Sequence, residues 1–261
     1  HSTAGYSVNS GMVVDLSDLQ GVVLDPARER VHVLPGTDFD HFNGAMNHTG
    51  WHVPTGACGS VCVGGFVQGG GYGYTSRAFG TQSDLVDSFR VALANGTIVT
   101  ASAQEHPDLY WALRGGTGGN FGVVLQVTYR MQRLDQVWAW AISWDAVHAA
   151  QVLTLMQAGY MKTGAPDALG YMMNLGFQNG VPVYMVQGMF CGSREDGLAA
   201  IAPLMAIPSA QLLVDKTGTY PDMNVWLEDH PYTLPDNLPD GIAETKASGY
   251  INTRLSPADW Q

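Results

Sequence analysis

The sequence predicts an α+β protein built from two consecutive regions. The first region, residues 1–130, is rich in glycine and in short alternating runs of β-type residues, and glycine thins out after Arg130. The second region, residues 131–261, combines stretches of helical periodicity with paired apolar runs that are typical of strands. We therefore expect a mostly β first domain and a second domain in which helices cover an antiparallel sheet.

The composition is that of a folded protein and restricts the kind of partner. Apolar residues make up 46% of the 261 residues, which is enough for a sizeable core. The net charge of −11 and the absence of a basic run argue against nucleic acid, because phosphate contacts need clustered Lys and Arg. No apolar run reaches the length of a membrane span. The sequence therefore predicts neither a nucleic-acid nor a membrane partner, and it leaves the compartment open.

Capping residues and alternation predict the first elements of the chain. Gly11–Leu16 (GMVVDL) is typical of a short buried strand, and Gly21–Gly36 is typical of a hairpin. Asp38 is a suitable N-cap for a helix. The apolar positions on one face of this helix are Phe39, Phe42 and Met46.

Further along the first region, turn and helix signals recur. Asn95-Gly96 separates two alternating runs and predicts a hairpin with a type I′ turn. His106–Leu113 is interpreted as a short helix, and a strand is expected to begin at Val123.

In the second region we expect two helices and three strands. Asp145 is a possible cap for a helix that runs to about Lys162. The face of this helix predicted to be apolar consists of Val147, Ala150, Leu153 and Met156. Ser193, with acidic residues in the turn after it, opens a second helix through about Met205. The expected strands are 169–177, 181–192 and 210–216.

Two glycine-rich segments, Gly64–Gly73 and Gly115–Gly122, are the most unusual feature of the first region. Successive glycines allow backbone N–H groups to approach phosphate oxygens, which favours a nucleotide diphosphate. Neither segment fits the common motifs: no lysine follows as in a P-loop, and the second segment runs into a strand rather than a helix. The alternative, tight turns and chain crossings in a β-rich core, stays open at this point.

Cysteine usage adds to the interest of the first segment. The chain has three cysteines, which is not a disulfide framework, and the C-x3-C pair Cys58 and Cys62 provides too few ligands for a closed zinc site. Cys62 lies between two valines and is interpreted as a small buried hydrophobe. Cys58 lies among small residues just before the glycines, within reach of a ligand that they hold.

Four ordered motifs carry a family resemblance. The segments HSTAGYS, GMVVDLSDL, PTGACGSVCVGGFVQGGGYGYTSRAFG and DLYWALRGGTGGNFGVV resemble the berberine-bridge-enzyme-like FAD-linked oxidases of the vanillyl-alcohol-oxidase group. The match is dense over residues 1–130 and looser beyond, through GMFCGSRED and ETKASGYI. It implies a two-lobed PCMH-type FAD-binding domain in residues 1–130, with its N-terminal part missing. Residues 131–261 are then a substrate-binding domain that continues beyond Gln261, and we expect the chain to be a portion of a longer polypeptide.

The resemblance also implies which residues hold the cofactor. His1 falls on the histidine joined to the flavin 8α-methyl group, and Cys58 falls on the cysteine joined to flavin C6, so that FAD is held covalently at two points. Gly64, Gly65, Gly69 and Gly70 fall on the loop beside the flavin and its ribityl chain, and Val123 falls near the adenosine end. The remaining expected cofactor-binding residues are Ser2, Thr55 and Gly56.

Some positions depart from the family pattern or have another explanation. Phe66 replaces a histidine that contacts the cofactor in many members, and the segment that supplies the catalytic base lies beyond Gln261, so no base is assigned. Tyr184 and Gln187 lie on opposite faces of one strand of the expected substrate-facing sheet, so only one of them faces the flavin. The helix residues expected to pack and cap rather than to do chemistry are Asp108, Tyr110 and Trp111.

The histidines do not form a metal motif. The pattern H-E-x-x-H is absent, and the four histidines of the first half, interpreted as surface or satisfied polar residues, are His32, His41, His48 and His52. We therefore expect no metal site.

The functional hypothesis that follows is an FAD-dependent oxidase. It would transfer hydride from an alcohol or amine carbon of a bulky small-molecule substrate to flavin N5, with molecular oxygen as acceptor. The substrate classes left open are a sugar, a glycosylated natural product and an alkaloid. The alternatives are a non-redox cyclase that uses FAD and a degenerate fragment that only binds a partner.

Overall fold

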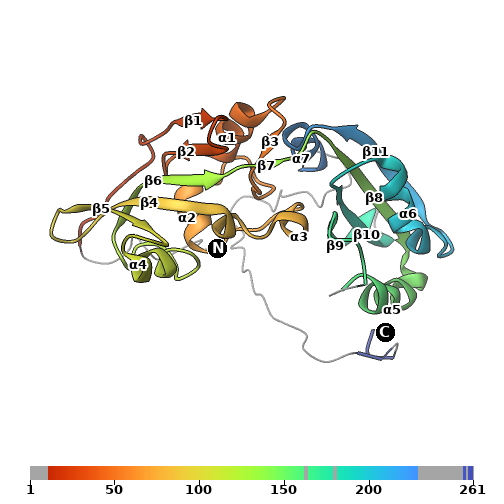
Figure 1. Cartoon of the computed structure of the whole chain (residues 1–261). Coiled ribbons are helices and arrows are strands. Elements are labelled where there is room, and N and C mark those ends of the chain that lie inside the picture. Colours follow the sequence, from red (N-terminus) through yellow and green to blue (C-terminus); the bar gives the residue numbers. More distant parts are fainter. Residues whose placement is uncertain (1–10, 162–163, 179–180, 229–254, 257, 261) are drawn as a thin grey trace. The chain divides into compact units, whose positions relative to one another are not determined.

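The computed structural model describes residues 11–161, 164–178, 181–228, 255–256 and 258–260 (Figure 1). The chain divides into two compact units. The first consists of residues 1–135 together with 219–222, and the second consists of residues 136–218 and 223–261.

A five-stranded antiparallel sheet forms the centre of the first unit (Figure 1). In spatial order its strands are β1 (Val22–Asp25), β2 (Arg30–Val33), β6 (Val123–Arg130), β4 (Val86–Ala92) and β5 (Ile98–Ser102). The pairing of Val22 with Val33 and of Asp25 with Arg30 confirms the predicted first hairpin. The strand predicted from Val123 is confirmed as β6, which is the middle strand of the sheet.

Short helices and a two-stranded ribbon surround this sheet. They are α1 (Phe39–Met46), β3 (Trp51–His52), α2 (Val63–Gln68), α3 (Ser76–Phe79), the 3₁₀ turn η1 (Gln82–Leu85), α4 (Pro107–Ala112) and β7 (Gln132–Arg133), which pairs with β3. The Asp38 carboxylate accepts a hydrogen bond from the backbone N–H of His41 at 2.9 Å, which confirms the predicted cap of α1.

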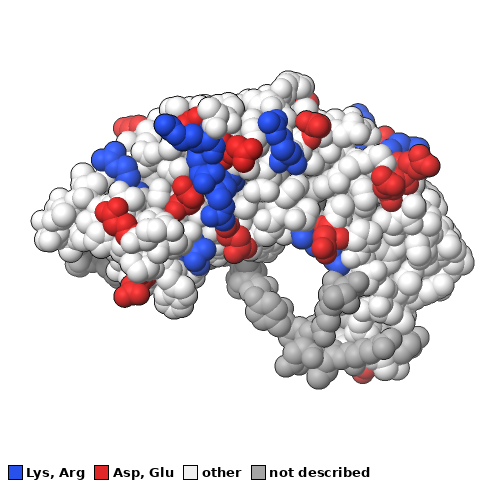
Figure 2. Space-filling view, viewed as in Figure 1, with Lys and Arg blue, Asp and Glu red and all other residues white. Residues whose placement is uncertain are grey.

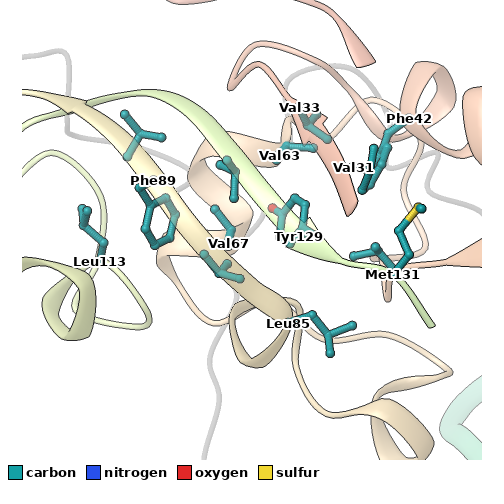
Figure 3. Packing of buried hydrophobic residues seen from close by; sticks show 14 of the residues in the cluster. Val31, Val33, Phe42, Val63, Val67, Leu85, Phe89, Leu113, Tyr129 and Met131 are labelled. Atoms are coloured by element: carbon teal, nitrogen blue, oxygen red, sulfur yellow. The ribbon is translucent and has the colours of Figure 1, made fainter. Parts of the chain in front are cut away.

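Side chains from α1 and α2 form one apolar core with the sheet (Figure 3). Phe42 of α1 and Val67 of α2 are fully buried in the same cluster as Val31, Phe89 and Tyr129 of the strands. This packing fixes α2, and therefore the first glycine-rich segment, against the sheet.

One predicted strand is wrong in this structure. Gly11–Leu16 has no strand conformation, and Met12 and Val13 are 88% and 61% exposed. A strand needs a neighbour for its backbone hydrogen bonds, and no described residue pairs with this run. An apolar β-type pattern was therefore not sufficient to form the element.

The hairpin at Asn95-Gly96 exists, but its turn differs from the predicted type. The N–H of Gly96 donates to Leu93 O, the N–H of Leu93 donates to Thr97 O, and only Gly96 has a positive φ, of 81°. A type I′ turn needs positive φ at both central residues. The loop is instead a type I turn followed by a left-handed glycine, the three-residue form of hairpin connection.

The second unit contains a four-stranded antiparallel sheet covered by helices, as expected. In spatial order the strands are β11 (Gln211–Gly218), β8 (Val137–Asp145), β10 (Val181–Phe190) and β9 (Leu169–Gln178). The helical elements are η2 (Ala146–His148), α5 (Ala149–Gly159), α6 (Arg194–Met205) and α7 (Tyr220–Glu228), whose first residues belong to the first unit. Ser193 accepts a hydrogen bond from the N–H of Asp196, which confirms the predicted start of α6.

The core of this unit lies between one face of the sheet and the helices. Trp138, Trp140 and Trp144 of β8 pack in one cluster with Met156 of α5 and Ile201 of α6. The predicted apolar face of the α5 segment is wrong by part of a turn: Val147 is 81% exposed, and the residues that α5 buries are Ala149, Val152 and Met156. The reason is that α5 begins only at Ala149, after a 3₁₀ turn that changes the periodicity.

Charged side chains are sparse and of mixed sign on the surface. Figure 2 shows acidic and basic groups interspersed on the face in view, separated by wide uncharged areas. Among the described residues, no helix is long and apolar enough to cross a membrane.

Candidate functional site

The candidate site is centred on the segment from Pro54 to Gly73 in the first unit. Thr55 is fully buried and Gly56 is buried, whereas Cys58 is exposed. The chain therefore passes from the core to the surface within three residues. This brings the cysteine predicted to hold the flavin to an accessible position.

The turn that carries both cysteines lies against the start of α1. Phe39 N–H donates to Val61 O and Asp40 N–H donates to Gly59 O, while Val63 N–H donates to Thr37 O. A side chain at Gly59 would collide with the Asp40 carboxylate. Backbone hydrogen bonds thus fix the turn from Cys58 to Cys62 on the helix.

The interpretation of Cys62 as a core residue is wrong. Cys62 is exposed, at the N-cap position of α2, because the turn directs it outward while Val63 enters the core. Its surroundings raise its pKa, first through partial desolvation and then through the negative charge of Asp38. Burial raises the pKa of the third thiol, Cys191, to about 12. A thiol with a raised pKa is a poorer nucleophile at neutral pH.

The predicted cofactor-binding glycines fall into two groups. Gly64 is closed by internal packing, since an added Cβ would lie 2.7 Å from Pro35 Cβ. An added Cβ at Gly65 or Gly70 would meet nothing within 4 Å, and one at Gly69 would meet only backbone oxygens beyond 3.5 Å. Gly64 and Gly65 lie in α2 rather than in the predicted loop, because Val63 and Val67 are buried one helical turn apart. The glycines with open space on their Cβ side are therefore Gly65, Gly69 and Gly70.

Gln68 joins the two glycine-rich segments. Its backbone carbonyl accepts hydrogen bonds from the N–H groups of Gly115 (3.0 Å) and Thr117 (3.2 Å). Its side-chain Nε2 donates to Gly64 O at 2.8 Å. Gln68 is 8% exposed, and its Oε1 is buried without a hydrogen-bond partner in the described part of the chain. A buried acceptor of this kind costs free energy unless a donor reaches it.

The second glycine-rich segment shows the same division between closed and open positions. Gly122 is closed by the backbone of Ala92, whereas Gly115 and Gly119 have positive φ and open space on the Cβ side. Val123 follows as the first residue of β6, half-buried and paired with Ala92. The predicted adenosine contact at Val123 thus lies at the end of a segment that Gln68 ties to the first.

These residues fit a bound FAD. Bare backbone at Gly65 and Gly70 permits the close approach that phosphate and ribityl groups need. Gln68 Oε1 would accept a hydrogen bond from a ligand hydroxyl or amine, and Cys58 offers an accessible sulfur. Turns and chain crossings explain Gly64 and Gly122. Positive φ angles likewise explain Gly70, Gly115 and Gly119, but neither reason applies to Gly65 or Gly69.

Phe66 has a structural role in this chain. Its ring contacts Phe39 edge to face, with 4.7 Å between the ring centroids. Added Cβ atoms at Gly56 and at Gly71 would both meet the ring. An apolar ring between two glycines offers no polar group at the position where the family resemblance led us to expect a histidine.

A buried polar network lies behind the site, and the sequence alone did not indicate it. Tyr220 donates a hydrogen bond from its hydroxyl to Thr55 O at 2.9 Å, and Asn43 accepts one from the Thr55 hydroxyl at 3.2 Å. His52 Nε2 lies 2.8 Å from Thr75 Oγ1, and burial lowers the pKa of His52 to about 3. This confirms the interpretation of His52 as a satisfied polar residue.

The other predicted residues are placed as follows. His1 and Ser2 lie outside the described residues. Tyr184 and Gln187 lie on β10, three residues apart and therefore on opposite faces, and Gln187 is 5% exposed. No cluster of potential metal ligands occurs among the residues that the structure describes.

The helix residues expected to pack or cap give a mixed result. Tyr110 is buried and donates to Val86 O at 2.6 Å, as expected for packing. Trp111 is 76% exposed and does not pack, since it lies about 100° further round α4 than the buried Tyr110. Asp108 lies in the first turn of α4 and does not cap it, because the cap position is occupied by His106.

Comparison with known families defines the class of the first unit. Residues 1–102 match the family model described as an FAD binding domain. The matched part of the first unit is therefore similar to an FAD-binding domain, and it contains the open glycines Gly65, Gly69 and Gly70.

Individual relatives extend the match into the second unit. Xylooligosaccharide oxidase of Thermothelomyces thermophilus is 31% identical over 221 residues, which are 81% of this chain and 43% of the relative. The uncharacterized FAD-linked oxidoreductase YvdP of Bacillus subtilis is 30% identical over 255 residues, which are 93% of this chain and 54% of the relative. The chain thus spans about half the length of these curated relatives.

Solved structures share the fold. Xylooligosaccharide oxidase from Myceliophthora thermophila C1, in complex with xylobiose, matches with a TM-score of 0.72 and 31% identity, over 81% of this chain and 45% of that one. Glucooligosaccharide oxidase from Acremonium strictum, with a 6-S-cysteinyl, 8α-N1-histidyl FAD, matches with a TM-score of 0.70 and 24% identity, over 82% of this chain and 45% of that one. The resemblance seen in the sequence is confirmed: residues 1–102 match an FAD binding domain, and the relatives are named as FAD-linked oxidoreductases and oxidases.

Proposed function

We propose that the protein containing this chain is an FAD-dependent oxidase that acts on an oligosaccharide or a similar bulky substrate, with O2 as acceptor. The observation that carries the proposal is that one segment contains both the accessible Cys58 and backbone that is bare at Gly65, Gly69 and Gly70. This arrangement occurs within an FAD-binding domain. Relatives named as oligosaccharide oxidases support the choice of substrate class.

The chain's own residues would hold the cofactor and keep it in place. FAD, when bound, supplies a hydride acceptor. The glycines with open Cβ positions would let the cofactor lie against bare backbone, and Gln68 Oε1 would accept a hydrogen bond from one of its hydroxyl or amine donors. The two attachment points would be His1 and Cys58. Ser2 follows His1, and the buried residues Thr55 and Gly56 precede Cys58. The base that removes the substrate proton is not assigned to any residue of this chain.

Two attachments are favoured by the cysteine positions. Of the two exposed cysteines in the turn, Cys62 has a raised pKa and stands beside Asp38. The oxidase from Acremonium strictum carries both a cysteinyl and a histidyl bond to its flavin. The family resemblance assigns the bond to flavin C6 to Cys58 and the bond to the 8α-methyl group to His1, and the raised pKa of Cys62 argues against Cys62 as the attachment point.

Peptide mass mapping tests this proposal. The protein is precipitated with acid, the pellet is examined for bound flavin, and the digest is searched for flavin on His1 and on Cys58. Cys58→Ser should abolish the cysteinyl adduct and leave the histidyl one, whereas the matched variant Cys62→Ser should retain both. Flavin on Cys62, or on neither cysteine, would contradict the assignment.

Anaerobic mixing with xylobiose or a related oligosaccharide tests the reaction. An oxidase should bleach the flavin absorbance without O2 and recover it when air is admitted. Product formation without bleaching would instead indicate a non-redox use of FAD. A protein that binds no flavin would indicate that only a partner-binding fragment remains.

A further inference from the structure

Thr55, three residues before Cys58, is held by a residue from the far end of the chain. The hydroxyl of Tyr220 donates to the Thr55 carbonyl at 2.9 Å and also lies 3.1 Å from Thr55 Oγ1. Tyr220 is 3% exposed and Thr55 is fully buried. Although 165 positions separate them, residues 219–222 belong to the first unit.

Neighbouring contacts hold the same segment from other sides. Gln82 Nε2 donates to Pro54 O at 3.0 Å, and Tyr129 in turn donates to Gln82 Oε1 at 2.9 Å. A side chain at Gly73 would collide with the Thr55 carbonyl. The backbone on the N-terminal side of Cys58 is therefore fixed by several contacts, of which the bond to Thr55 O depends on Tyr220.

Tyr220 itself has a fixed position. Its ring contacts the buried ring of His52 edge to face, with 4.4 Å between the centroids. A hydroxyl on such a ring acts as a rigid donor, because a buried tyrosine ring has little rotational freedom. The bond to Thr55 O thus places the backbone of the cysteine segment relative to the β3 ribbon that carries His52.

We propose that Tyr220 is a positioning residue for the attachment of Cys58 to the flavin, acting through the carbonyl of Thr55. This inference rests on the proposed function. Attachment joins the sulfur to flavin C6 with loss of the thiol proton and the C6 hydrogen, and two electrons pass to O2 to give H2O2. Cysteine has a short side chain, so the sulfur reaches a near-attack distance only if the backbone is correctly placed.

The test compares two tyrosines of the first unit with the same local chemistry. Tyr220→Phe removes a buried hydroxyl that donates to Thr55 O. Tyr110→Phe removes a buried hydroxyl of α4 that donates to Val86 O of β4. Both variants lose one hydroxyl-to-carbonyl bond, and Tyr220→Phe also loses the 3.1 Å contact with Thr55 Oγ1. They differ in whether the carbonyl precedes Cys58.

The first measurement is the rate at which flavin becomes attached to Cys58, which peptide mass spectrometry monitors over time. Each variant is kept the same number of degrees below its own melting temperature. Tyr220→Phe should slow attachment at Cys58 by about 10-fold or more and leave attachment at His1 unchanged. Tyr110→Phe should change neither. Equal slowing in both variants, or slowing at both attachment points in Tyr220→Phe, would overturn the proposal.

The second measurement does not depend on flavin. Amide hydrogen exchange of the peptide that contains residues 54–60 should become faster in Tyr220→Phe than in the wild type and in Tyr110→Phe. If the wild type carries no flavin on Cys58, the proposed tether fails, while faster exchange still shows that Tyr220 fixes the segment. Unchanged exchange in Tyr220→Phe would overturn the positioning role itself.

Discussion

Adjacent glycines in α2 should respond in opposite ways to the same substitution. An alanine at Gly64 would place its Cβ 2.7 Å from Pro35 Cβ and 3.0 Å from Pro35 O. An alanine at Gly65 would meet nothing within 4 Å of its Cβ. The two sites are neighbours in one helix, so the variants differ mainly in what their methyl groups meet.

The expected effects on stability follow from these surroundings. Gly65→Ala should raise the free energy of unfolding of the flavin-free chain by about 0.5 kcal/mol, because alanine loses less backbone entropy in a helix. Gly64→Ala should lower it by roughly 1–2 kcal/mol, because overpacking against Pro35 exceeds that gain. At about 2–4 °C per kcal/mol, the melting temperature should rise by about 1–2 °C in Gly65→Ala and fall by about 2–8 °C in Gly64→Ala.

Although Gly65→Ala should stabilise the flavin-free chain, it should weaken the binding of FAD. If the cofactor lies on the bare backbone at Gly65, a methyl group there should obstruct it and reduce the affinity by about 10-fold or more, the equivalent of ~1.4 kcal/mol. The assay is thermal unfolding together with FAD titration of chains prepared from riboflavin-starved cells. Two results would refute the reasoning: normal FAD binding by Gly65→Ala, which would place the cofactor elsewhere, or a lower melting temperature, which would show that the position is not open.

Two further predictions concern the residues behind the site. The pKa of His52 is about 3 in the folded chain and 6.5 in the reference state, so that the unfolded chain is protonated first as the pH falls. The contribution of His52 to the free energy of unfolding should be complete above about pH 6.5 and fall by ~1.4 kcal/mol per pH unit down to about pH 3. Urea unfolding at several pH values should show that His52→Gln flattens this slope, and an unchanged slope would contradict the assignment. Phe66→Ala removes the ring that lies between Gly56 and Gly71 and should lower the free energy of unfolding by about 2 kcal/mol. A urea titration that detects no loss would show that the ring does not support these glycines.

Local signals predicted many elements of the fold because their causes are local. A capping side chain acts on a backbone N–H three residues away, as Asp38 does in α1 and Ser193 does in α6. The hairpin at Asn95-Gly96 was found for a similar reason. Only its turn type was wrong, because that depends on one backbone angle at Asn95.

Errors arose where an outcome depends on a distant neighbour. The run Gly11–Leu16 has the residues of a strand but no partner strand among the described residues. Cys62 has apolar neighbours in sequence, yet the turn onto α1 directs its side chain to the surface. Neither result follows from composition or spacing.

The candidate site could be predicted only in part. The glycine-rich segments and Cys58 were recognisable from their motifs. The difference between Gly64 and Gly65 depends on Pro35, and the hydrogen bond between Thr55 and Tyr220 joins positions 165 residues apart. Contacts of this kind exist only once the chain has folded.

The return of residues 219–222 to the first unit has a consequence for synthesis. The ribosome synthesises Asp135 well before Thr219, and at about 5–20 residues per second the interval is roughly 4–17 s. During that time the Thr55 carbonyl and the ring of His52 lack their partner Tyr220. The buried hydrogen bonds of the first unit can therefore be completed only after residues 136–218 of the second unit have been synthesised. The first unit depends for its final packing on residues 219–222, which are synthesised later than the rest of it.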